Sequence, residues 1–106
     1  MTREQMSEFV KVAKLSELAP GAARKVDLSG QDVALFNVAG KICAIQDLCP
    51  HRGGSLAEGY LEGDTVTCPW HGWRFRVTDG LNPVNPAAKV SCYQVKVEGD
   101  DVYVSA

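Results

Sequence analysis

Apolar and polar residues alternate in several short stretches of the chain, and turn residues separate these stretches. The alternation is clearest in residues 73–77 and 93–97, where it has the two-residue period of a half-buried strand. Gly99-Asp100 is a two-residue hairpin signal. Further strands are predicted at 9–12, 24–28, 32–38, 41–46 and 101–104, with two very short strands joined by Glu62-Gly63-Asp64. This pattern predicts an all-β fold, a small antiparallel β-sandwich or barrel.

Helical periodicity is missing from every segment of useful length. We expect one helical turn at Ser16-Glu17-Leu18, with Ser16 as N-cap and Pro20-Gly21 as its end. Residues 47–73 interrupt the rhythm of strands and turns, and we expect them to form an inserted subdomain that carries two loops. With 106 residues, the chain has the length of one domain, which we place at residues 1–106.

Charge and hydropathy exclude several classes of partner. A formal net charge of -2 does not fit nucleic-acid binding, which requires a basic surface. The chain lacks an apolar run of the ~20 residues that cross a bilayer, so we expect no membrane partner. The first ten residues, MTREQMSEFV, do not resemble a secretory signal. We therefore expect a cytoplasmic protein whose thiols stay reduced.

Two short motifs contain both histidines of the chain. C-P-H-R-G-G occupies residues 49–54 and C-P-W-H-G-W occupies residues 68–73, with sixteen residues between the first histidine and the second cysteine. Two thiols and two imidazoles at these spacings indicate a metal site rather than two disulfides. A structural zinc site with two cysteines and two histidines is one candidate. A wholly non-metal interpretation is weaker, because each histidine is paired with a Cys-Pro dipeptide.

These motifs resemble the two cluster-binding loops of Rieske [2Fe–2S] proteins. A proline-containing segment, Asn82-Pro83-Val84-Asn85-Pro86, resembles the third loop of that fold. The resemblance implies one [2Fe–2S] cluster per chain, with Cys49 and Cys68 on one iron and His51 and His71 on the other. The glycines of the motifs would let the backbone approach the cluster closely. The expected supporting residues of the loops are Gly53, Gly54, Trp70, Gly72 and Pro86.

The loops favour the low end of the Rieske potential range. Two neutral imidazoles in place of two thiolates raise the potential into a range of about -150 to +300 mV. High-potential respiratory members typically have two further cysteines that link the loops, and often a serine after the second motif. Here the corresponding places hold Gly54 or its neighbours, Trp70 and Trp73. We expect a potential near about -150 mV, and we expect Cys43 and Cys92 to be small buried apolar residues in strands.

The chain is similar to the small ferredoxin components of bacterial aromatic-ring dioxygenase systems. That resemblance implies a monomeric one-electron carrier between an NAD(P)H-dependent flavin reductase and a terminal oxygenase, with transient docking to each. The small Rieske subunit of an assimilatory nitrite reductase is the alternative, and a structural zinc domain is a remote one. Oxygenase large subunits also contain a Rieske domain, but their second iron needs a 2-His-1-carboxylate triad. With no spare histidine, we expect no catalysis by this chain alone.

Overall fold

The computed structural model describes residues 9–28, 30–48, 54–69, 72–84 and 88–105, and these residues form strands and short 3-10 turns. Along the chain they are β1 (Val10–Lys14), η2 (Leu15–Glu17), β2 (Ala23–Leu28), β3 (Gln31–Val38), β4 (Lys41–Gln46), η3 (Leu56–Glu58), β5 (Tyr60–Glu62), β6 (Thr65–Thr67), β7 (Arg74–Arg76), β8 (Cys92–Glu98) and β9 (Asp101–Ser105). The all-β prediction is confirmed. None of the described helical turns has the length and apolar character needed to cross a bilayer.

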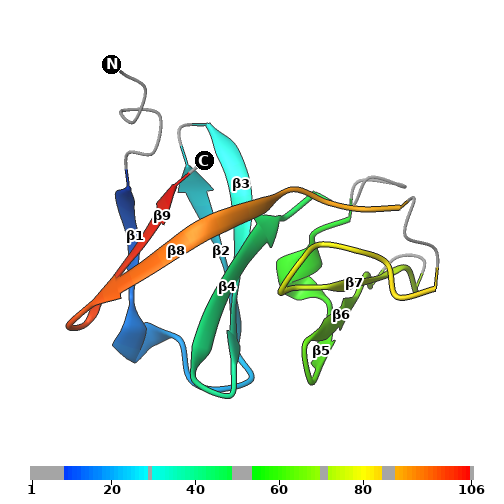
Figure 1. Ribbon diagram of the computed structural model, residues 1–106, viewed down its shortest axis with the longest axis horizontal. Helices are drawn as coiled ribbons and strands as arrows, with labels where there is room; N and C mark the ends of the chain where they lie inside the picture. The colour runs from blue at the N-terminus through cyan, green and yellow to red at the C-terminus, as the bar shows by residue number, and fades with distance from the viewer. Residues whose placement is uncertain (1–8, 29, 49–53, 70–71, 85–87, 106) are drawn as a thin grey trace.

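Six strands form one antiparallel sheet in the order β1-β9-β8-β4-β3-β2. The sheet curls until its two edge strands, β1 and β2, contact each other. Figure 1 shows the result, a barrel that is nearly closed and that has β1 and β9 on one side. Strand β8 links the two halves of the curled sheet, because its first residues pair with β4 and the rest of the strand pairs with β9.

Strands β3 and β4 are buried on both faces. Val33 and Leu35 of β3 point into the barrel core, while Ala34 and Phe36 belong to a second apolar cluster outside it. Residues 42–45 of β4 divide between the two clusters in the same alternating way. An unbroken apolar run is the sequence pattern of a strand that is covered on both faces. These two strands therefore contribute to two apolar clusters, one inside the barrel and one on its outer side.

A smaller antiparallel sheet, in the order β5-β6-β7, packs on that outer side. Leu56, Val66 and Phe75 bury their side chains there, together with Phe36 and Ile45 of the barrel. Figure 1 shows the small sheet beside the barrel, at the side away from β1 and β9. We call residues 47–90 the loop unit. The predicted insertion ended at residue 73, which is too early, because β7 pairs with β6 through Arg76.

The first helical turn differs from the prediction in its cap. The 3-10 turn begins at Leu15, with Lys14 in the N-cap position, so the assignment of Ser16 as N-cap is wrong. Both the backbone N–H and the hydroxyl of Ser16 donate to the carboxylate of Asp100, at 2.8 and 3.0 Å. The backbone N–H of Leu15 donates to the carbonyl of Asp100 at 2.7 Å. The turn is therefore fixed by the distant β8–β9 hairpin as well as by a longer local hydrogen bond, from the N–H of Lys14 to the carboxylate of Glu17 at 3.4 Å.

Candidate metal centre

The described residues on either side of the first motif are held together by hydrogen bonds. Leu48 and Ser55 form an antiparallel bridge, and the N–H of Leu56 donates to the carbonyl of Asp47 at 2.7 Å. The carboxylate of Asp47 accepts from the Ser55 hydroxyl at 2.9 Å and from the Ala57 N–H at 2.8 Å. The two ends of the first loop are therefore fixed relative to each other. The sequence analysis missed Asp47 and Ser55, although an acidic residue two positions before a predicted ligand is a visible signal.

The second motif begins directly after β6 and closes before β7. The backbone N–H of Cys68 donates to the carbonyl of Trp73 at 2.7 Å, and the N–H of Gly72 donates to the carbonyl of Cys68 at 3.1 Å. Thr67 and Arg74 pair on the two strands beneath the loop. The local geometry thus makes a tight hairpin loop with Cys68 at its base.

The third loop is closed in a similar way. Leu81 and Lys89 form an antiparallel bridge, and the N–H of Asn82 donates to the carbonyl of Ala88 at 3.0 Å. Within the loop, the N–H of Val84 donates to the Asn82 side-chain oxygen at 2.8 Å, which stabilises a turn. The loop unit therefore presents three loops, each with a hydrogen-bonded base.

The structure describes three of the predicted site residues: Gly54, Cys68 and Gly72. Gly54 is buried, as a residue packed under a loop should be. Gly72 has φ of +74°, and among the described residues nothing lies within 4 Å of the position that a Cβ would take. Its backbone conformation, rather than a close approach, therefore requires glycine. The remaining predicted residues lie outside the described part of the chain and stay predictions: Cys49, His51, Gly53, Trp70, His71 and Pro86.

Cys68 has the properties expected of a metal ligand. Its side chain is 1% exposed, it forms no disulfide, and it packs in the apolar cluster that the loop unit shares with the barrel. Within the described residues, no three His, Cys, Asp or Glu side chains gather as a metal site. Cys68 is the one predicted ligand among them. A buried, unpaired thiol at the base of a pinned loop fits the two-sulfur, two-nitrogen donor set of a Rieske cluster.

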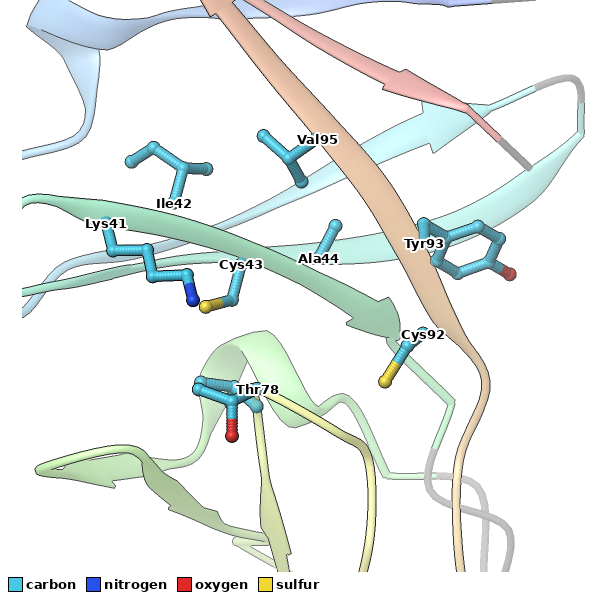
Figure 2. A pocket seen from close by; sticks show the side chains of 9 residues that line it. Lys41, Ile42, Cys43, Ala44, Thr78, Cys92, Tyr93 and Val95 are labelled. Carbon is cyan, nitrogen blue, oxygen red and sulfur yellow. The ribbon is translucent and has the colours of Figure 1, made fainter. Parts of the chain in front are cut away.

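Cys43 and Cys92 lie elsewhere, at the junction of the barrel and the loop unit. Figure 2 shows both side chains directed toward the same pocket, with Thr78 on the opposite side. The pocket has a volume of about 170 Å³. Cys43 is buried as predicted, but Cys92 is exposed, and the prediction for it is wrong. The reason lies in the alternation of β8, because Cys92 is on the same exposed face of that strand as Gln94 and Lys96.

Both thiols are poorly suited to act as thiolates. Burial raises the pKa of Cys43, and the negative charge of Asp64 raises it further against the opposing effect of Lys41. Burial also raises the pKa of Cys92, with smaller contributions from Asp79 and Cys43. Because a thiol is a nucleophile and a metal ligand only when deprotonated, these two cysteines stay protonated at neutral pH.

Gly80 is a further structural residue. Its φ is +76°, and a Cβ there would overlap the carbonyl oxygen of Val90 and lie 3.0 Å from the Sγ of Cys92. Glycine is thus required by its backbone conformation and by the close approach of Val90, which precedes β8, and of Cys92, the first residue of β8. An Asp-Gly pair is a local turn signal, but these two contacts depend on the assembled fold.

Comparison with known proteins gives consistent results. Residues 8–97 match the model of the Rieske [2Fe-2S] domain. The biphenyl dioxygenase ferredoxin subunit of Pseudomonas sp. (strain KKS102) is 41% identical over 98 residues, covering 91% of this chain and 90% of that protein. A solved complex of reduced oxygenase and oxidized ferredoxin in carbazole 1,9a-dioxygenase contains a chain that is 34% identical, with a TM-score of 0.84 and 92% coverage of both chains.

The family matches and the donor set of the two motifs agree on the cofactor. The structural agreement extends over the barrel and the loop unit together, because more than nine-tenths of the chain superimposes on the carbazole dioxygenase ferredoxin. The predicted Rieske-type [2Fe–2S] cluster is confirmed as the cofactor that these matches imply. This chain therefore belongs to the Rieske [2Fe–2S] domain family.

Proposed function

We propose that the protein carries single electrons from an NAD(P)H-dependent flavin reductase to a terminal oxygenase of the aromatic-ring-hydroxylating type. The observation that supports this role most directly is the set of relatives that match almost end to end. The biphenyl dioxygenase ferredoxin subunit and ferredoxin CarAc of Metapseudomonas resinovorans, at 41% and 34% identity, each cover more than nine-tenths of this chain. A carbazole dioxygenase ferredoxin at 34% identity is in a complex with its oxygenase.

In this proposal the chain's own residues hold the cluster and shield it. Cys49 and Cys68 would bind one iron and His51 and His71 the other. The bound cluster supplies reversible one-electron chemistry in a Rieske range of about -150 to +300 mV. Cys68 would bind from the inner, apolar side, where its side chain is 1% exposed. Exclusion of water on that side limits the loss of iron and leaves the outer side of the loops for electron transfer.

Two exposed apolar side chains suit transient docking to a redox partner. Leu48, at the base of the first loop, is 56% exposed, and Val84, in the third loop, is 85% exposed. Apolar residues in the centre of an otherwise polar surface are typical of protein interfaces. Individual exposed apolar side chains support contact without permanent association, which a shuttle between two partners requires.

We further propose that the chain is not an enzyme by itself. Both of its histidines are committed to the cluster, and a 2-His-1-carboxylate iron site needs two more. The terminal oxygenase of carbazole 1,9a-dioxygenase from Nocardioides aromaticivorans superimposes with a TM-score of 0.87, yet the match covers only 30% of that oxygenase chain. A monomer in the cytoplasm fits the free thiols of Cys43, Cys68 and Cys92.

A redox titration followed by electron paramagnetic resonance tests the proposal. Anaerobically purified protein should be red-brown, contain about two irons per chain, and show a midpoint potential near about -150 mV. It should also support oxygenation by a purified terminal oxygenase when a flavin reductase and NADH are present, and no turnover without the oxygenase. Colourless protein with one zinc per chain would overturn the assignment. A potential above about +100 mV would overturn the low-potential role.

A nitrite reductase subunit is the second candidate. A solved structure provisionally named as the small subunit of an NADPH nitrite reductase is 25% identical, with a TM-score of 0.81 and coverage of 93% of this chain. The dioxygenase ferredoxins match at higher identity over a similar length, and we therefore rank this function second. Electron delivery to a purified nitrite reductase large subunit, but not to an oxygenase, would reverse the order.

A further inference from the structure

Asp47 is a buried carboxylate that no role in the sequence motifs explains. Its side chain is 3% exposed, and it lies directly after β4 and two positions before the predicted ligand Cys49. The carboxylate oxygen Oδ1 accepts two hydrogen bonds, from the hydroxyl of Ser55 at 2.9 Å and from the backbone N–H of Ala57 at 2.8 Å. Charged groups at this level of burial persist only when they are well hydrogen-bonded.

The backbone of Asp47 joins the same residues to the barrel. Its N–H donates to the carbonyl of Asp32 on β3 at 3.2 Å, and its carbonyl accepts from the N–H of Leu56 at 2.7 Å. The incoming end of the first loop is therefore tied to the barrel on one side and to residues 55–57 on the other. Together with the Leu48–Ser55 bridge, Asp47 thus holds the two ends of the segment that contains Cys49 and His51 at a fixed separation.

We propose that Asp47 is a positioning residue for the cluster: its carboxylate sets the geometry of the first ligand loop and thereby slows the loss of iron. Groups that orient metal ligands through hydrogen bonds typically contribute 10–100-fold, roughly, to metal retention. The inference needs the cluster, but it does not depend on which proteins exchange electrons with it.

Two substitutions separate hydrogen-bond geometry from the rest of the side chain. Asp47→Asn keeps an oxygen that can accept from both Ser55 and Ala57, whereas Asp47→Ala removes the acceptor. Ser55→Ala removes one of the two bonds and leaves the carboxylate in place. Asp27→Ala, an exposed carboxylate on β2, serves as the matched control for loss of an acidic side chain outside the loop unit.

The experiment follows cluster loss from holoprotein under a fixed excess of iron chelator, by the decay of visible absorption, with paramagnetic resonance spectra of the reduced proteins. Asp47→Ala should lose its cluster about 10–100 times faster than the parent protein, with altered or broadened g-values. Asp47→Asn should stay within about threefold and keep the parent spectrum, and Ser55→Ala should be intermediate. Asp27→Ala should match the parent protein.

The result that overturns the proposal is equally specific. Parent-like cluster loss and spectrum in Asp47→Ala would do so, and so would an Asn variant that loses its cluster as fast as the Ala variant. If Asp47→Ala does not fold, Ser55→Ala decides: faster cluster loss supports the proposal and an unchanged rate overturns it. Neither a reductase nor an oxygenase is present, so failure here is distinct from failure of the electron-carrier function.

Discussion

The barrel and the loop unit differ in what holds their strands in place. Strand β3 has eight residues and pairs along its length with β2 and β4, whereas β5, β6 and β7 have three residues each. Strands that short are not stable on their own and need a packed face. The loop unit obtains this face from the barrel, through Phe36 and Ile45. The barrel, in contrast, has a separate core of its own inside the curled sheet.

The difference shows that the site lies on the part of the molecule with the least independent stability. Polar contacts substitute there for long strands: the Asp47 carboxylate at the first loop and the Asp79 carboxylate at the β7 turn. Metal binding adds a further restraint, since ligands from two loops become cross-linked through the cluster. Binding free energy then contributes to folding of the loop unit. Four predictions test this difference in stability between the barrel and the loop unit.

The largest effect is expected from Cys68→Ser. Loss of a thiolate ligand should abolish the cluster, because the replacement hydroxyl is a poor ligand for iron at neutral pH. The barrel should persist, since its inner core does not include residue 68. Iron content and visible absorption report on the cluster, and far-ultraviolet circular dichroism reports on the strands. Cys92→Ser is the matched control and should keep the parent iron content, because Cys92 lies at the junction pocket.

Truncation of one large buried side chain in each core should show whether the barrel and the loop unit unfold separately. Phe75 and Leu35 are both fully buried, Phe75 in the shared cluster and Leu35 in the barrel core. Phe75→Ala should cost about 3–5 kcal/mol and Leu35→Ala about 2–5 kcal/mol of unfolding free energy. In thermal unfolding, Phe75→Ala should lose visible absorption before far-ultraviolet dichroism, whereas Leu35→Ala should lose both together. Coincident loss in the Phe75 variant would show that the two regions unfold as one.

Two glycines allow the cost of an added Cβ to be compared between a site with close neighbours and an open turn. Gly80 and Gly99 both have positive φ, at +76° and +61°, but only Gly80 faces Val90 and Cys92 at short range. Gly99→Ala should cost roughly 1–2 kcal/mol from backbone conformation alone. Gly80→Ala should cost roughly a further 1–3 kcal/mol from overlap with the backbone of Val90. Denaturant unfolding of the two variants measures the difference, and equal costs would contradict the contact at Gly80.

The smallest effect concerns pH and the turn after β7. The Leu81 N–H, followed by the side chain of Arg76, lowers the pKa of Asp79 below its ordinary value. A carboxylate with a lowered pKa stabilises the fold above its unfolded pKa, near about 4, and this stabilisation is lost as the pH falls through the folded pKa. Asp79→Asn should therefore lower the Tm slightly at neutral pH, and the difference from the parent should close below about pH 4. Asp27→Asn, an exposed carboxylate on the barrel, is the control, and a gap that widens in acid would contradict the prediction.

Local sequence signals predicted most of the barrel. The Gly99-Asp100 turn and the alternating strand beside it depend on neighbouring residues only, and the structure has them in place. The error at Ser16 concerns a contact between distant residues, because Ser16 binds Asp100, 84 positions away. The error at Cys92 has a local cause, because Cys92 continues the exposed face of β8 that Gln94 and Lys96 mark in the alternating pattern.

The site was predictable to the extent that its chemistry lies in short motifs. Cys68 could be predicted as a ligand from C-P-W-H alone, and the structure has it buried at the base of a closed loop. The carboxylate of Asp47 could not, since its importance depends on Ser55 and Ala57 folding back onto it. All four predicted ligands remain predictions as ligands, and three of them, Cys49, His51 and His71, lie outside the described residues.

The strands at which the chain leaves and re-enters the barrel are immediate neighbours. Gln46 ends β4, and its N–H donates to the carbonyl of Ser91, just before β8, at 2.9 Å. The segment between these two residues thus leaves and re-enters the barrel at one place, and it packs on the outer face of β3 and β4. An exchange of residues 47–90 between family members would need only two splice junctions, side by side, so that redox properties could be transplanted while the host barrel stays the same.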